Sequence, residues 1–299
     1  MKRRINIILL PLIGTMLIII FSDIGIPLGT RGWIVVTSLL CITIFILYEE
    51  GYYIDSYQII KSACLPYIRA IMRATQEKAI QNTLEPLDPS FAAALNSMYA
   101  RQPQMGTDGS MHILDGTTKI SPEEGMWIYG LCRKIKPQRT LEIGMAYGFC
   151  TMYFLAAIKA NGMGSHVAID PYEITHWHGI GVKKAQEMGM ERSLRFIQTS
   201  SVFGLPDLAR EGSEFEVIFL DGDHKFDDVL LDFTMADYVC AKGGYIILHD
   251  MDLPSIRKVV SFIENNRSDY QRLNTPIANI RVLKKVDDDR RQWDHFLHF

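Results

Sequence analysis

Cysteine is scarce in this sequence, and its few positions form no recognisable pattern. The five cysteines lie far apart, without a Cys-x-x-Cys pair or a cysteine/histidine ligand spacing. Such a pattern argues against a disulfide framework and against a zinc site. A reducing compartment fits this cysteine usage best.

The chain also lacks an excess of charge of either sign. Its formal net charge is −3, and the 31 lysines and arginines are scattered along the sequence. Because nucleic-acid binding needs a concentrated basic surface, we expect no nucleic-acid partner. Internal repeats and low-complexity tracts are missing too, while a hydrophobic content of 48% in 299 residues is enough for a well-buried core.

Charge is missing altogether from two hydrophobic runs near the N-terminus. They cover residues 5–21 and 32–48, each about 17 residues long, which is the lower end of the roughly 17–25 residues that cross a bilayer as a helix. A short turn containing Gly and Pro joins them, so residues 1–50 are predicted to form a transmembrane helical hairpin. Basic residues precede the first run at 2–4 and follow the second at 61, 69 and 73, and the positive-inside rule then places the rest of the chain in the cytoplasm.

Two alternatives for the first run stay open. One is a cleaved secretory signal, although no small-residue cleavage site follows Phe21. The other is a re-entrant or interfacial hairpin, because Pro11 and Gly14 interrupt the run. Membrane association holds in the second case as well.

Residues 51–110 are predicted to form a helical connector or lid. Apolar residues recur at helical spacing between residues 54 and 83, with a kink expected at Pro66. A second helix is predicted over 89–99, with Asp88 as its N-cap and Pro89 in its first turn. The following Gly-, Pro- and polar-rich stretch, 101–110, is the expected domain boundary.

Residues 111–299 are predicted to form one α/β domain. Short apolar runs alternate with helical patterns and predict parallel strands at 140–143, 166–169, 194–198, 217–220 and 245–248. Segments 270–273 and 280–286 predict an antiparallel hairpin at the sheet edge, after a helix at 255–266. The expected fold is a Rossmann-like, doubly wound, mostly parallel sheet of seven strands.

The strongest local motif is LEIGMAYG, which follows the first predicted strand. Glu142 precedes Gly144 by two residues, and Gly148 follows after three more. A tight turn at this place lets the backbone approach a ligand closely. The spacing is not the G-x-G-x-x-G of dinucleotide-binding proteins, and the acidic residue suits a cationic ligand better than a phosphate. The alternative is a strand-to-helix turn that binds nothing.

The next strand ends in Asp170, within the sequence AIDPYE. A carboxylate at this position can accept hydrogen bonds from both hydroxyls of a ribose, which makes adenosine recognition plausible. An aspartate that only stabilises the turn before Pro171 is an equally weighted alternative when Asp170 is considered alone.

Two further strands end in clusters of acidic and histidine residues. The clusters, LDGDH and LHDMD, contain Asp221, Asp223, His224, His249, Asp250 and Asp252. Because the carboxyl ends of parallel strands share one edge of the sheet, the clusters are expected to converge. Asp221 and Asp250 supply the oxygen ligands that Mg²⁺ or a similar ion prefers, and His249 would complete the site or orient its waters.

The order and spacing of these motifs resemble those of class I S-adenosylmethionine-dependent methyltransferases. The resemblance covers about residues 111–287 and is to the metal-dependent small-molecule O-methyltransferase type, including its sugar and antibiotic-tailoring branch. It implies a set of residues around S-adenosylmethionine: Glu142, Gly144, Tyr147, Gly148, Asp170, Trp177, Ser200 and Ser201. It also implies Asp221 and Asp250 as metal ligands.

The resemblance further assigns His224 as the base that takes the acceptor's proton, beside Asp221. A histidine that only stabilises a helix start is the alternative for His224. Two departures stand out. Met251 occupies the place of an asparagine in catechol-type members, so His249 or Asp252 would be the third metal ligand, and Ser200 stands where an aspartate is usual.

We therefore expect a membrane-anchored enzyme that methylates a hydroxyl of a small-molecule, sugar or lipid-linked acceptor. A noncatalytic S-adenosylmethionine-binding scaffold or sensor subunit and a metal-independent N-methyltransferase are the alternatives. A homo-oligomer is left open. His176 and His178 are expected in a mobile loop rather than in a metal site.

Overall fold

The structure is a computed structural model that describes residues 65–299, with side chains from residue 75 onward. The predicted transmembrane runs lie outside the described residues. No helix within the described part is long and apolar enough to cross a membrane. Residues 1–78 and 79–299 form two separate units, and of the first only the helical residues 65–78 are described. The second unit is compact and begins upstream of the boundary that the sequence predicted near residue 110.

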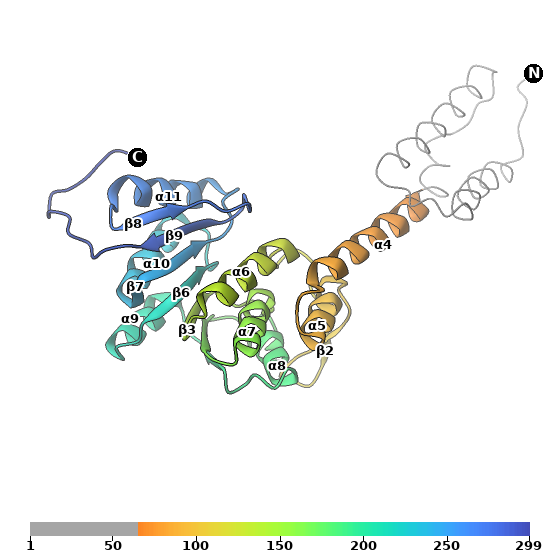
Figure 1. The fold of residues 1–299 in the computed structure, drawn as a ribbon. Helices are drawn as coiled ribbons and strands as arrows, with labels where there is room; N and C mark the ends of the chain where they lie inside the picture. The colour runs from red at the N-terminus through yellow and green to blue at the C-terminus, as the bar shows by residue number, and fades with distance from the viewer. Residues whose placement is uncertain (1–64) are drawn as a thin grey trace, which may run out of the picture. The chain divides into compact units, whose positions relative to one another are not determined.

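Helices and strands alternate along the second unit (Figure 1). The helices are α4 (Leu65–Leu84), α5 (Pro89–Tyr99), α6 (Pro122–Ile135), α7 (Phe149–Asn161), α8 (Ile180–Glu187), α9 (Ser201–Arg210), α10 (Phe226–Val239) and α11 (Pro254–Asn266). The strands are β1 (Gln104–Met105), β2 (Met111–His112), β3 (Arg139–Ile143), β4 (Ser165–Ile169), β5 (Leu194–Ile197), β6 (Phe215–Leu220), β7 (Cys240–Leu248), β8 (Tyr270–Leu273) and β9 (Arg281–Lys285).

The predicted sheet is confirmed. Its seven strands lie in the order β5-β4-β3-β6-β7-β9-β8. The first five are parallel, and β9 pairs antiparallel with both β7 and β8. The chain leaves β3 in opposite directions toward β4 and later toward β6, so a crevice opens at the carboxyl ends of β3 and β6.

Helices cover both faces of this sheet (Figure 1). On one face α5 to α8 bury a core that includes Tyr153 and Phe154 against Phe219. On the other face α9 to α11 bury Phe233 and their other apolar side chains against residues such as Ile246. Apolar side chains on both faces explain why the parallel strands read as nearly continuous hydrophobic runs.

Two helices begin where local sequence signals place them. The Asp88 side chain accepts a hydrogen bond from the Ser90 amide, which caps α5 as predicted. At the start of α6, the Ser121 hydroxyl accepts from the Glu124 amide, and the Glu124 carboxylate accepts from the Ser121 amide. This reciprocal capping box fixes the first turn of α6.

A small hairpin lies in the stretch that the sequence predicted as a break between domains. Its strands β1 and β2 pair antiparallel, with Gln104 opposite His112. Strands of two residues leave no periodic pattern, so this pairing could not be predicted from the sequence. The Thr107 amide in the hairpin donates to the His178 carbonyl, 2.9 Å away in the loop before α8.

Candidate functional site

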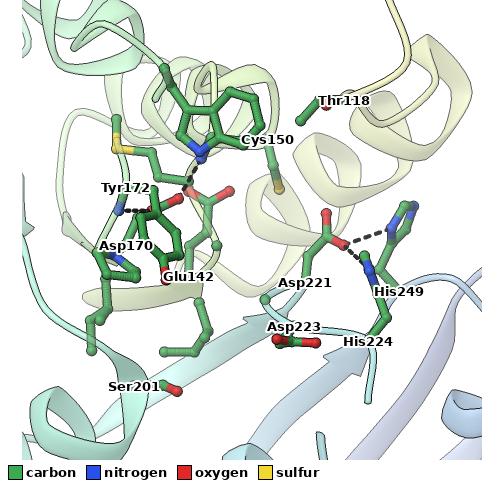
Figure 2. Close-up of a pocket in the computed structure, with 18 of the residues that line it drawn as sticks. Thr118, Glu142, Cys150, Asp170, Tyr172, Ser201, Asp221, Asp223, His224 and His249 are labelled. Carbon is green, nitrogen blue, oxygen red and sulfur yellow. Dashed lines mark hydrogen bonds and ion pairs between the residues drawn. The ribbon is translucent and has the colours of Figure 1, made fainter. Parts of the chain in front are cut away.

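A cavity of about 640 Å³ opens at the carboxyl edge of the sheet (Figure 2). Its walls are the loops that follow β3, β4, β5, β6 and β7, together with residues 117–120 before α6. Figure 2 shows Glu142 and Asp170 at one end of the cavity and Asp221, His224 and His249 at the other. The predicted site residues, apart from Gly148 and Asp252, therefore line a single cavity.

The turn after β3 requires glycine at two places. Gly144 has φ +89°, and a Cβ atom there would lie 2.0 Å from the Asp221 carbonyl oxygen. Gly148 has φ +80°, and its Cβ would lie 2.6 Å from the Gly181 Cα. The glycines thus let the β3–α7 turn pack against the loop after β6 and against α8, which brings its backbone to the cavity wall.

Glu142 is fully buried at the end of β3. Its Oε2 accepts a hydrogen bond from the Thr151 hydroxyl at 2.5 Å and lies 3.1 Å from His166 Nε2. Its Oε1 is buried too, yet has no hydrogen-bond partner among the described residues. Burial raises the pKa of Glu142. Buried polar atoms are rarely left without a partner, so this oxygen marks a place for a donor from a ligand.

Asp170 holds the backbone of two loops. Its Oδ2 accepts from the Ala146 amide at 2.8 Å, and its Oδ1 accepts from the Tyr172 amide at 2.7 Å. Ala146 has a φ of +47°, which a non-glycine residue seldom adopts without such support. Each carboxylate oxygen retains a further lone pair, so Asp170 can stabilise the turn and accept a hydroxyl of a ligand as well.

The remaining predicted cofactor residues also line the cavity. The rings of Tyr147 and Trp177 meet edge to face, with centroids 5.0 Å apart. Ser200 is the N-cap of α9, and Ser201 is its first residue. Asp232 was not predicted from the sequence; it is a buried residue of α10 that lines the cavity and accepts a hydrogen bond from the Ser201 side chain. Burial raises the pKa of Asp232 to about 6.

His224 faces both of the predicted metal-binding aspartates. Its Nε2 lies 2.8 Å from Asp250 Oδ2 and 3.6 Å from Asp221 Oδ1. These three side chains are arranged so that they could hold one metal ion. Hydrogen bonds to Asp221 and Asp250 raise the pKa of His224 to about 10.

His249 lies behind the same two aspartates and is almost entirely buried. Its Nδ1 is 3.0 Å from Asp221 Oδ1 and 3.1 Å from Asp250 Oδ1, while its Nε2 is 3.4 Å from Glu124 Oε1. Burial lowers the pKa of His249, but hydrogen bonds to Asp221, Asp250 and Glu124 outweigh it and raise the value to about 12. Both imidazoles therefore contact the aspartate pair, and they share Asp221 Oδ1.

Two residues of this cluster were not found from the sequence. Glu124, from the capping box of α6, accepts a hydrogen bond from Asn279 Nδ2 at 3.1 Å through its Oε1. Asn279, from the β8–β9 loop, also lies 3.3 Å from Asp250 Oδ1. Met251 packs among apolar residues instead, and Asp252 is not among the residues that line the cavity. Only the capping-box pattern could have pointed to Glu124, and nothing local marks Asn279.

Comparisons with known proteins agree with the fold. Residues 141–251 match the family model described as a methyltransferase domain. The chain is 27% identical over 139 residues to a flavonoid 3',5'-methyltransferase of Vitis vinifera, covering 46% of this chain and 51% of that protein. It is 22% identical over 150 residues to a caffeoyl-CoA O-methyltransferase of Stellaria longipes, covering 46% and 61%. The matches thus span about half to three fifths of these curated relatives.

Solved structures share the fold over most of their length. The O-methyltransferase TomG of Streptomyces achromogenes, solved with S-adenosylmethionine, is 20% identical with a TM-score of 0.51, covering 67% of this chain and 91% of that one. The methyltransferase PaMTH1 of Podospora anserina, solved with S-adenosylhomocysteine, is 14% identical with a TM-score of 0.54, covering 72% and 96%. Residues 141–251 thus match a methyltransferase domain, and the fold is similar to that of solved O-methyltransferases.

Proposed function

We propose that this protein methylates a hydroxyl of a small-molecule, sugar or lipid-linked acceptor at a membrane, using S-adenosylmethionine and a divalent cation. One observation carries the proposal: Glu142, with its unsatisfied oxygen, and the Asp221–Asp250–His224 cluster face the same cavity. A methyl donor and a hydroxyl acceptor held at these two ends would be aligned for transfer, and alignment supplies much of the rate enhancement of a displacement reaction.

The residues at one end of the cavity fit S-adenosylmethionine, which supplies an activated methyl group when bound. Glu142 Oε1 would accept a hydrogen bond from the amino group of the cofactor, and Asp170 would accept from a ribose hydroxyl. Gly144 lines this end of the cavity and lets the β3–α7 turn pack directly against the backbone of the loop after β6. The carboxylates also suit the positive charge of a sulfonium.

The residues at the other end fit a divalent cation, which lowers the pKa of a coordinated hydroxyl. Asp221 and Asp250 would hold it with oxygen ligands, as Mg²⁺ prefers. His249 would be the third ligand, or would orient the aspartates from behind. His224 Nε2 faces the same carboxylates from the side of the cavity, which makes it a candidate ligand as well as a candidate base.

His224 can act as a base only when it has lost its proton. Asp221 and Asp250 now hold that proton by charge and hydrogen bonding. With both carboxylates engaged by a divalent cation, His224 would lose this support and become able to accept the proton of an acceptor hydroxyl.

The membrane part of the proposal rests on the sequence of residues 5–21 and 32–48. Two uncharged apolar runs with basic outer flanks favour a hairpin anchor with the methyltransferase domain in the cytoplasm. An acceptor that is made or held at the membrane would then meet the cavity at a raised local concentration.

The first test is calorimetric titration of the full chain with S-adenosylmethionine, with and without Mg²⁺. The second is release of S-adenosylhomocysteine with a catechol, a flavonoid and a sugar with vicinal hydroxyls as acceptors. We expect cofactor binding, and turnover that EDTA abolishes and Mg²⁺ restores. Asp221→Asn and Asp250→Asn should lose turnover while they still bind the cofactor.

Two other results would replace this proposal. Turnover that persists in EDTA would favour a metal-independent methyltransferase. In that case His224 and His249 alone would neutralise the aspartates, and both histidines already form ion pairs with them. Cofactor binding without turnover, combined with full cellular function of Asp221→Asn, would favour a noncatalytic sensor or scaffold.

A further inference from the structure

A second group of possible metal ligands lies outside the cavity, where the β1–β2 hairpin meets the loop before α8. Asp108 and His112 belong to the hairpin, and His178 belongs to the loop. One ligand atom from each lies within 4.8 Å of the other two. Two imidazoles and one carboxylate form the donor set that suits Zn²⁺ and neighbouring ions of the first transition series.

The three side chains are already in mutual contact. His112 Nε2 lies 2.9 Å from Asp108 Oδ2, and the rings of His112 and His178 stack with centroids 3.7 Å apart and planes within 3°. A metal ion binds in the plane of an imidazole, so coordination requires the two rings to turn out of this stack. The Asp108 and His112 side chains are 48% and 21% exposed, which leaves room for that turn.

The backbone fixes the distance between the two segments. The Thr107 amide donates to the His178 carbonyl at 2.9 Å. A Cβ atom on Gly106 would lie 2.6 Å from the His178 oxygen, and one on Gly179 would lie 2.1 Å from Thr107 Oγ1. Glycines at these positions permit this close backbone contact, which holds the segment of Asp108 and His112 next to the segment of His178.

The conformation of His178 itself contributes to the arrangement. Its φ is +58°, in the left-handed region that few residues other than glycine and asparagine adopt. A histidine held in this conformation costs folding free energy on the order of 1 kcal/mol. The hairpin contact keeps it there, and the ring then lies against His112.

We propose that Asp108, His112 and His178 bind a transition-metal ion of the Zn²⁺ class, which ties the β1–β2 hairpin to the loop at 171–179. Three protein ligands leave the remaining positions to water. Trp177 precedes His178 and lines the cavity, so the bound ion would fix this part of the cavity wall. The effect of the ion on the cavity rests on the proposed methyltransferase function, whereas the metal site itself does not.

The test is calorimetric titration of the untagged full chain with Zn²⁺. His178→Asn removes one ligand and tolerates positive φ. Asp108→Asn removes the carboxylate charge but keeps the acceptor for the Ser110 amide, 2.9 Å away. We expect each change to weaken this Zn²⁺ site at least about tenfold. The matched control is His176→Asn, which changes an exposed histidine two residues away whose ring meets Thr175 and Tyr172. This variant should bind Zn²⁺ like the unmodified protein.

A second readout reports the same event without a change of sequence. Zn²⁺ should slow hydrogen exchange of the Thr107 amide, because the ion would hold its acceptor in place. An isotherm for His178→Asn that matches the unmodified protein would overturn the proposal. So would Zn²⁺ binding that disappears entirely in Asp250→Asn. Neither titration contains S-adenosylmethionine, so failure here leaves the methyltransferase proposal untouched, and failure of cofactor binding leaves this site untouched.

Discussion

Only one of the two carboxylate oxygens of the buried Glu142 has hydrogen-bond partners among the described residues. Thr151 and His166 occupy Oε2, whereas Oε1 has no partner in the described part of the chain. An unsatisfied buried acceptor costs about 1–3 kcal/mol, and a ligand that donates to it recovers this free energy. A ligand that donates to Oε1 would therefore raise the stability of the domain.

Replacing Glu142 with glutamine should weaken S-adenosylmethionine binding by roughly 10- to 100-fold, the usual range for a lost hydrogen bond to a charged group. The side chain keeps its shape, so calorimetry can be compared directly with the unmodified protein. Urea unfolding of the same sample is the control for folding. Unchanged affinity in a folded Glu142→Gln protein would mean that Oε1 does not face the cofactor.

Asp232 should make stability depend on pH in an unusual direction. Burial raises its pKa from 3.8 to about 6, so the folded protein holds a proton that the unfolded chain releases. This group therefore destabilises the fold as pH rises from about 4 to 6, and the cost stays constant above that, reaching about 3 kcal/mol at most. Below pH 4 both states are protonated and the cost disappears.

The Asp232→Asn protein should accordingly be more stable than the unmodified protein at pH 7 and nearly equal to it at pH 4. Urea unfolding at a series of pH values measures the difference. Asp227→Asn changes an exposed residue of the same helix and should show no such trend. A difference that does not vary with pH would show that Asp232 is ionised at the same pH in both states.

At the scale of single elements, the β3–α7 turn depends on the absence of a side chain at Gly144. Gly144→Ala would force positive φ on alanine and push its Cβ to 2.0 Å from the Asp221 carbonyl. We expect a loss of at least about 3 kcal/mol of stability, or of cofactor binding if the loop after β6 moves instead.

Gly162→Ala is the matched control for that change. Gly162 also has positive φ, +68°, but a Cβ there would meet nothing within 4 Å. Its cost should therefore be limited to the backbone strain of about 1–2 kcal/mol. Equal losses for both variants, measured by urea unfolding, would mean that the close contact with Asp221 contributes nothing.

The helices and strands that could be predicted carry the signal in their own residues, as apolar runs or as capping residues. The parallel strands are apolar on both faces, and α5 carries Asp88 and Pro89 at its start. The β1–β2 hairpin could not be predicted, because it forms through its contact with the loop at His178. Asn279 was missed for a similar reason: it reaches Asp250 only because β9 pairs with β7.

For the whole molecule, the order of motifs along the chain predicted one shared site because a doubly wound sheet brings successive strand ends to one edge. Contacts between segments that are distant in the sequence, such as Glu124 with His249, leave no repeating pattern in the sequence and could not be predicted. The ion pairs around His224 also could not be anticipated, since they depend on side-chain orientation.

The predicted anchor leads to a test on the complete protein. The full chain should stay in the membrane fraction after an alkaline carbonate wash, because two apolar helices hold it by the hydrophobic effect. A chain limited to residues 79–299, the compact unit, should be released. Placing aspartate at Leu12 and Ile13 should weaken retention, since each charge at a helix centre costs about 3 kcal/mol. Release of the unmodified full chain would contradict the anchor.

The Glu124 carboxylate serves two tasks at once. One oxygen completes the capping box that starts α6, and the other lies against His249 and Asn279 beside the aspartates. A substitution at this position therefore changes two things: the hydrogen bonds that start α6 and the contact with His249. A change at Glu124 that alters the cluster of His249 and the two aspartates would therefore also alter the start of α6, so an engineer who wishes to modify that cluster alone should leave this position unchanged.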